Sequence, residues 1–324
     1  MKLSHLLGML KRPIAVLSMA AAFAVVGTGT TLADDASVSL IQLRSYIVTP
    51  VGTEHGKFKD AGVALDTKIV TDNLLINEAM AGNASDVGIT GTTYQALAAP
   101  DLPYSIIAIA EQSPEAVGVI VAADSDIKSL ADLKGKTIAG GDGSPIAYVQ
   151  EALADVGIGK DDYKYVKIEA STGAAALAGK QIDAWISYNP FIAANVSKGL
   201  AKVIFTPSSK YFNNFVIILA TKKAIAEKPD ALAAFLKGYK ASLDWVRANK
   251  TEAVAEYAKV TGLEPDVAAT TFAKRNQQFK SPDASVVADF SREAQLYIKY
   301  GLITAEPDWS KVMNTEIWDR AFGN

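Results

Sequence analysis

The chain has 324 residues, of which 49% are hydrophobic and 21% are charged, with a formal net charge of −3. This composition is typical of an ordered globular protein and excludes a disordered one. The chain contains no cysteine, which excludes thiol catalysis, thiolate metal sites and a redox role. The charge is acidic and without pattern, which argues against nucleic-acid binding.

Residues 1–33 have the pattern of a cleavable export signal. A positive region formed by Lys2, Lys11 and Arg12 precedes the apolar stretch 13–26, and residues 31–33 fit a cleavage site. The alternative, a membrane anchor, is less favoured because the apolar stretch is short for a bilayer span. Cleavage would leave 29 basic and 35 acidic residues and a net charge of −6. With no cysteine to carry a lipid, we expect a soluble protein in the periplasm.

Strands and helices alternate over residues 38–110. Apolar runs and period-two alternation predict strands at 39–44, 63–69, 86–90 and 104–110. Between them, helices are predicted at 50–61, with Thr49 as cap and Gly62 as stop, and at 73–81 and 92–99. Alternation of this kind implies a parallel sheet with helices on both faces.

A second set of elements follows. Strands are predicted at 117–122, 137–139, 182–187, 202–206 and 215–221, with a helix at 145–156. From residue 229 the pattern is almost entirely helical, with helices at 231–248, 251–260, 265–279 and 283–300. In the last of these, one face should turn toward a core and carries Val287, Phe290, Ala294 and Tyr297.

The mature chain exceeds what one core usually holds, so two lobes are expected. We assign residues 37–115 and 222–324 to lobe I and residues 116–221 to lobe II. Connections made by short strands imply a hinge with a cleft that closes around a ligand.

Ligands of open parallel sheets bind beyond the carboxyl ends of the strands. In lobe I these ends carry Arg44, Ser45, Tyr46, Thr71, Asp72, Thr90, Gly91 and Thr92. In lobe II they carry Gly143, Ser144, Tyr188 and Asn189. Hydroxyls, an amide, an arginine and two tyrosines can surround a small polar or anionic group and cover its apolar part.

Several of these positions have a second interpretation. Arg44 is either solvated or the bidentate partner of a carboxylate, sulfonate or phosphonate. Thr92 could simply cap a helix. The helix that begins at Ser144 and Pro145 favours an anion at its N–H groups, although Asp142 could occupy them instead.

Two further residues, Trp185 and Arg275, have alternative interpretations. Trp185 stands between apolar neighbours, which favours core packing over exposure to the cleft. Arg275 is expected on the surface, with a binding role left open.

The sequence offers no catalytic machinery. Cleavage after residue 33 removes His5 and leaves His55 as the one histidine. His55 lies in a polar stretch of a helix and is expected to be solvated. No nucleophile elbow, zinc-protease motif, phosphate-binding loop or complete dinucleotide fingerprint is present. We therefore expect a protein that is not an enzyme and that uses no metal and no cofactor.

Several motifs carry a resemblance to a known family. They are Ser125–Ile127 with Asp132-Leu133-Lys134-Gly135-Lys136, Gly143-Ser144, the stretch from Gly179 to Pro190, and Asn83 to Gly91. In these, the chain resembles the solute-binding proteins of ABC importers in the nitrate, sulfonate and taurine group. The resemblance covers about residues 38–250 and implies a two-lobed type II periplasmic-binding fold of the α/β class. Its sheets would be mostly parallel and flanked by helices, with a hinge and a helical C-terminal region.

The resemblance also implies a function and a site. It places ligand contacts at Arg44 to Tyr46, Thr90 to Thr92, Gly143-Ser144 and Trp185 to Asn189. It implies capture of a small solute and delivery to a membrane permease driven by a cytoplasmic ATPase, by a protein that is a monomer by default. Thr71-Asp72 departs from the usual small turn, and Asp72 would suit a ligand with an amino group, such as taurine.

Three functions stay open at this point. The leading hypothesis is an uptake protein for a sulfonate-like anion or zwitterion. A second ligand class is an uncharged heterocycle such as a pyrimidine precursor. A sensor or adaptor that presents solute to a receptor would use the same cleft, whereas an enzyme on this fold is disfavoured by the lack of cysteine.

Overall fold

The computed structural model describes residues 36–70, 72–92, 94–99, 101–141 and 144–323, without the side chains of residues 95, 96, 144 and 145. The described residues form one compact unit. The predicted signal peptide, 1–33, lies outside the described residues, as do Thr71, Asp142 and Gly143. No described helix has both the length and the apolarity that crossing a membrane requires.

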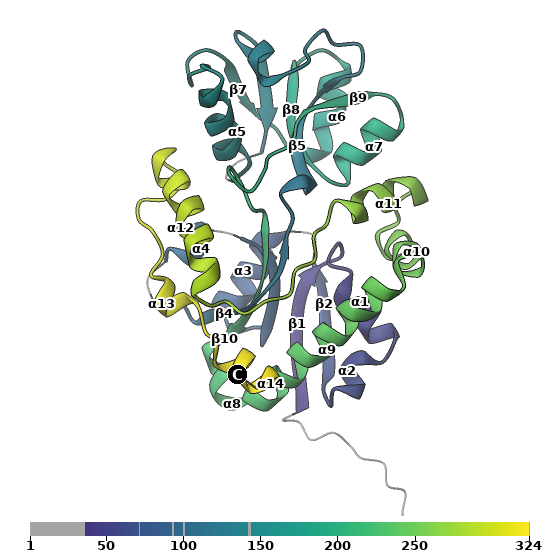
Figure 1. Ribbon diagram of the computed structural model, residues 1–324, viewed down its shortest axis with the longest axis vertical. Coiled ribbons are helices and arrows are strands. Elements are labelled where there is room, and N and C mark those ends of the chain that lie inside the picture. Colours follow the sequence, from purple (N-terminus) through teal and green to yellow (C-terminus); the bar gives the residue numbers. More distant parts are fainter. Residues whose placement is uncertain (1–35, 71, 93, 100, 142–143, 324) are drawn as a thin grey trace, which may run out of the picture. The chain divides into compact units, whose positions relative to one another are not determined.

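Sheet 1 has the strand order β2-β1-β3-β10-β4. β1 and β2 lie side by side on one side of it, and β4 and β10 on the other (Figure 1). Its strands are β1 (Ser37–Leu43), β2 (Ala64–Val70), β3 (Val87–Gly91), β4 (Tyr104–Gln112) and β10 (Phe215–Thr221). β1 runs parallel to β2 and β3, and β10 is antiparallel to both β3 and β4. The four strands predicted at 39–110 are therefore parallel to one another, and one antiparallel strand from later in the chain is inserted among them.

Sheet 2 follows the same plan, with the order β7-β6-β8-β5-β9. Its strands are β5 (Val117–Ala122), β6 (Thr137–Gly140), β7 (Lys164–Lys167), β8 (Ala184–Tyr188) and β9 (Ala201–Phe205). Here β6 pairs in parallel with β7 and β8, and β5 is antiparallel to β8 and β9. Both sheets are thus mixed.

The chain crosses between the sheets twice, and the two crossovers lie against each other. The first runs from β4 to β5 through the short helix η2 (Pro114–Ala116), and the second returns through residues 206–214. Ser113 N–H donates to the Asn214 carbonyl at 3.3 Å, and Asn214 Nδ2 donates back to the Ser113 carbonyl at 2.9 Å. The sequence assigned residues 215–221 to lobe II, but β10 lies in sheet 1, so the return crossover precedes it.

β3, β4 and β10 are buried on both faces, as a sheet covered by helices on both sides requires, whereas the edge strand β2 is mostly exposed. Along β10, Val216, Ile218 and Ala220 pack into one core, while Phe215, Ile217 and Leu219 pack into the other. This alternation follows from the period of two in an extended strand.

Helices from both ends of the chain supply the covering layers of sheet 1. They are α1 (Val48–Glu54), α2 (Lys57–Asp60), α3 (Asn73–Ala81), α4 (Tyr94–Leu97), α8 (Lys222–Glu227), α9 (Pro229–Ala248), α12 (Ala284–Lys299), α13 (Trp309–Val312) and α14 (Glu316–Phe322). α10 (Lys250–Thr261) and α11 (Pro265–Ala273) pack with α1 and α9 in a separate helical core. The first core receives α9, and the second receives α3 and α12. The C-terminal region is helical, as expected.

Sheet 2 is covered by η3 (Leu130–Leu133), α5 (Ser144–Asp155), α6 (Ala170–Ala178) and α7 (Phe191–Ser197). Ala184 and Ile186 of β8 pack on one side with α5, and Trp185 packs on the other side with α6 and α7.

Three local predictions need correction. The helix expected at 50–61 is divided into α1 and α2 by Gly56, whose φ of 68° lies in the left-handed region. Thr49 does not cap it, because the helix begins one residue earlier and Thr49 is buried inside α1. In α12, Val286 rather than Val287 belongs to the core.

Candidate functional site

A cavity of about 590 Å³ is lined by residues of both sheets and of α10 and α11. Sheet 1 contributes the carboxyl ends of β1, β2, β3 and β4, because parallel strands end at the same edge. Sheet 2 contributes the end of β8 and the start of β5. The cavity therefore lies at the edge where the sequence placed its ligand contacts.

The loop after β1 forms one wall. Arg44, Ser45 and Tyr46 all line the cavity. Arg44 is exposed, and its Nη1 lies 3.4 Å from the Val260 carbonyl. Tyr46 is buried, and burial strongly raises the pKa of its hydroxyl, so that the hydroxyl is neutral.

Asn73 organises the neighbouring wall, although the sequence analysis did not select it. It lines the cavity, and its Oδ1 accepts from Thr90 Oγ1 at 3.0 Å, from Gly91 N–H at 3.2 Å and from Tyr46 Oη at 3.4 Å. Thr90 is buried behind this amide, whereas Gly91 and Thr92 line the cavity. Thr92 Oγ1 donates to the Phe215 carbonyl at 3.0 Å.

Asp72 is occupied as a helix cap. Its carboxylate accepts from Leu74 N–H at 2.7 Å at the start of α3, and it is not among the cavity-lining residues. Its charge still reaches the cavity mouth, because Asp72 and Glu169 join burial in raising the pKa of Tyr188.

The lobe II predictions divide into three groups. Tyr188 and Asn189 line the cavity, with Tyr188 45% exposed and Asn189 Oδ1 accepting from Ala193 N–H at 3.1 Å. Trp185 is 1% exposed and packs against Gly173 in the core, so the structure separates it from the cavity. Gly143 lies outside the described residues, and Ser144 is described only as the first residue of α5.

The wall also contains a buried ion pair that the sequence analysis missed. Arg275 Nη2 lies 3.0 Å from Glu111 Oε2, and the two side chains are 12% and 4% exposed. Nε of Arg275 donates to both Glu111 oxygens, and Nη1 donates to the Ser45 carbonyl at 2.8 Å. Burial opposes the charge, yet Glu111 raises the pKa of Arg275, which stays protonated.

Glu111 could have been noticed as a charged residue at the end of an otherwise apolar strand. Arg275 has no such signal, because it follows α11 in a polar run. The expectation that Arg275 is a surface residue was wrong.

The electrostatic balance of the cavity depends on Arg44. The charged residues among its described lining are Arg44, Glu111 and Arg275, and the last two neutralise each other. Among the described residues, Arg44 forms a hydrogen bond only with a backbone carbonyl oxygen, that of Val260. The wall therefore presents one positive charge to a ligand.

One polar group in the wall lacks a partner. Thr271 lines the cavity and is buried, and its Oγ1 has no hydrogen-bond partner among the described residues. A buried hydroxyl without a partner carries a desolvation cost, which a hydrogen bond to a ligand would relieve.

The chain is similar to several named proteins. It is 27% identical to a Brucella abortus (strain 2308) protein named as a binding protein, over 93% of this chain and 96% of that one. It is 26% identical to an Escherichia coli (strain K12) protein named for aliphatic sulfonate binding, over 71% and 73% of the two chains.

Solved structures show the same fold. The periplasmic aliphatic sulphonate binding protein SsuA from Escherichia coli matches with a TM-score of 0.77 at 19% identity, over 86% of this chain and 92% of that one. The desulfurization enzyme DSZB matches with a TM-score of 0.68 at 14% identity, over 88% and 98%. The fold is thus that of periplasmic binding proteins, and an enzyme shares it.

The model of the NMT1/THI5-like family matches residues 46–253, more than half of the chain. That span includes β2 to β10 and much of the cavity wall. The chain belongs to the NMT1/THI5-like family.

Proposed function

We propose that the protein is the periplasmic solute-binding component of an ABC importer and that it binds a small sulfonate-like anion. The observation that carries the anion is Arg44, the cavity-lining cation whose charge no described carboxylate neutralises. A guanidinium can donate two parallel hydrogen bonds to a sulfonate. The names of the similar sulfonate-binding proteins point to the same ligand class.

The rest of the cavity suits a short organic tail. Apolar and aromatic side chains that line it include Ile69, Val117, Tyr188, Phe212 and Phe215. A cavity of about 590 Å³ falls within the size range of small-molecule sites. In this proposal the head group binds Arg44 and the Thr271 hydroxyl, and Tyr188 covers the tail.

The described residues favour a simple anion over a zwitterion such as taurine. The described lining contains no carboxylate free to pair with an ammonium group, because Glu111 is bonded to Arg275 and Asp72, outside the lining, caps α3. Nitrate would carry the charge but leave the apolar lining unused.

Delivery follows from closure of the two lobes about the paired crossovers. A protein that changes shape on binding can present its loaded form to a permease, and a cytoplasmic ATPase would then drive import. We propose that the protein acts as a monomer and that residues 1–33 direct it to the periplasm.

The test is calorimetric titration of the purified protein with ethanesulfonate, taurine, nitrate and uracil, in the wild type and in Arg44→Gln. We expect ethanesulfonate to bind most tightly and Arg44→Gln to weaken it by at least about tenfold, since a charge-assisted hydrogen bond contributes about 1.5–3 kcal/mol. The matched control is Arg320→Gln, which removes an exposed arginine outside this cavity and should leave the affinity unchanged.

The other outcomes identify the competing functions. Binding of uracil without any sulfonate would point to an uncharged heterocycle. Release of sulfite from a sulfonate during the titration would point to an enzyme, as DSZB shares the fold. Tight sulfonate binding together with normal sulfonate uptake in a strain lacking the protein would point to a sensor.

A further inference from the structure

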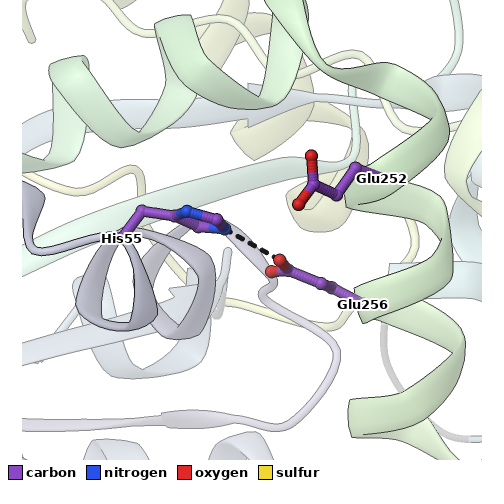
Figure 2. A group of neighbouring side chains, drawn as sticks. All are labelled: His55, Glu252 and Glu256. Atoms are coloured by element: carbon purple, nitrogen blue, oxygen red, sulfur yellow. Dashed lines mark hydrogen bonds and ion pairs between the residues drawn. The ribbon is translucent and has the colours of Figure 1, made fainter.

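His55, Glu252 and Glu256 form a cluster on lobe I, outside the candidate site. Their ligand atoms all lie within 4.8 Å of one another. Figure 2 shows the imidazole of His55 directed at the carboxylate of Glu256, with the carboxylate of Glu252 above it. His55 was expected to be solvated, but its side chain is 25% exposed and Nε2 lies 2.8 Å from Glu256 Oε1.

The packing of the surrounding helices holds these three positions in place. His55 follows the last residue of α1, and its ring stacks on Trp245 of α9, with centroids 3.8 Å apart and planes inclined by 27°. The glutamates are four residues apart on α10, so they share one face of that helix. Next to them in the sequence, Ala253 and Tyr257 are buried in the core that joins α1, α9, α10 and α11.

The charges of the cluster are unbalanced. Two carboxylates lie within one turn of α10, and a single imidazole faces them. Glu252 is exposed and forms no ion pair with a described cation. Like charges at this helical spacing repel each other, so a bound cation would relieve a real cost.

The donor set and its spacing suit a transition-metal ion. Two ligands of one zinc ion, each about 2.1 Å from it, can be at most about 4.2 Å apart. A rotamer change of the exposed Glu252 side chain covers the difference from 4.8 Å. One imidazole nitrogen with two carboxylate oxygens is a set that zinc accepts, whereas magnesium and calcium prefer oxygen ligands alone.

We infer that His55, Glu252 and Glu256 bind a divalent transition-metal ion, with zinc as the best fit and with water completing its coordination. The ion would tie the end of α1 to α10. α10 also carries Tyr257 and Thr261, which line the cavity, so the ion would brace the back of that wall.

The test is titration of the tag-free, metal-stripped protein with zinc chloride by calorimetry, and with cobalt chloride by visible absorption and tryptophan emission. We expect one equivalent of zinc, a cobalt absorption band and quenching of Trp245, which stacks on His55. Magnesium chloride should give no heat of binding. Glu252→Gln should weaken zinc by at least about tenfold, because even groups that only support metal ligands contribute that much.

Glu54→Gln is the matched control. It removes the same charge from an exposed residue next to His55 that is not part of the cluster, and it should bind zinc like the wild type. His55→Gln provides a second variant that removes the imidazole nitrogen and should also weaken zinc. The inference is wrong if the wild type does not bind zinc, or if Glu252→Gln and Glu54→Gln bind it equally.

Discussion

At the scale of single residues, the protein places two ion pairs side by side in different environments. Arg275 and Glu111 are buried, whereas their neighbours Lys274 and Glu115 are exposed and joined at 2.7 Å. When one partner of a buried pair is removed, the other charge stays buried and is neither paired nor hydrated. When one partner of an exposed pair is removed, water hydrates the other charge. The two pairs should therefore differ widely in what they contribute to stability.

We predict that Glu111→Gln lowers the free energy of unfolding by at least about 3 kcal/mol, because it leaves the Arg275 charge buried and unpaired. Glu115→Gln should lower it by less than about 1 kcal/mol. Urea unfolding followed by circular dichroism measures both variants. Equal losses would mean that the Arg275 charge is hydrated in the folded protein.

Glu293 is a second buried carboxyl group, next to the return crossover. It accepts hydrogen bonds from Tyr94 Oη at 2.9 Å and from the Asn213 N–H. Burial raises the pKa of Glu293 from 4.5 to about 7, even though these bonds act in the opposite direction. Between these two values the folded protein holds a proton that the unfolded chain has released, so stability should fall as the pH rises through this window.

We predict that Glu293→Gln removes that fall, because a neutral amide stands in for the protonated carboxyl. The fall attributable to Glu293 is at most about 3 kcal/mol between about pH 5 and about pH 8. Urea unfolding at both pH values measures it, with the exposed Glu227→Gln as a control that keeps the wild-type profile. Identical profiles in wild type and Glu293→Gln would contradict the assignment.

The sequence predicted the position of the cavity better than it predicted which side chains line it. The loop from Arg44 to Tyr46 was found because strand ends are readable from local pattern and parallel strands end at one edge. Arg275 and Thr271 reach the cavity from α11 and the segment after it, and their approach depends on tertiary packing that no local pattern encodes.

At the scale of elements, α6 packs closely on β8 because Gly173 of α6 has no side chain. A Cβ at Gly173 would lie 2.2 Å from the ring of Trp185, which fills the space beside the glycine. Trp185 is buried in this core, although the family resemblance had placed it among the ligand contacts.

We predict that Gly173→Ala destabilises the protein by about 1–3 kcal/mol, since the ring can move only by disturbing its own packing. Ser171→Ala, at an exposed position of the same helix, should change stability by less than about 0.5 kcal/mol. Urea unfolding compares the two. If Gly173→Ala is neutral, the tight contact between α6 and Trp185 does not exist.

The elements that the sequence predicted best are continuous apolar runs and a helix that ends at a glycine. The helix at 73–81 and the strands at 117–122 and 215–221 have the predicted bounds. β7, α6 and α7 were missed, because β7 is short and half polar and α6 is rich in alanine. The place of β10 in sheet 1 could not be read from its sequence, since an antiparallel insertion depends on pairing with distant strands.

At the scale of the whole molecule, closure of the lobes requires the two edges of the cavity to approach each other when a ligand binds. Tyr188 precedes α7 on one edge, and Asp72 precedes α3 on the other. Because the chain has no cysteine, spin labels can be attached at Leu75→Cys and Lys198→Cys, both exposed positions on those helices or at their ends. We predict a shorter distance between the labels with saturating ethanesulfonate, and an unchanged distance would contradict closure.

The central claim is that the cavity recognises a sulfonate by its charge. Calorimetric titration of the wild-type protein with ethanesulfonate and with ethyl methyl sulfone, an uncharged analogue of similar size, tests it most directly. We predict that one equivalent of ethanesulfonate binds and that the sulfone binds at least about tenfold more weakly, because only the anion can pair with Arg44. Equal binding of both compounds, or binding of neither, would contradict it.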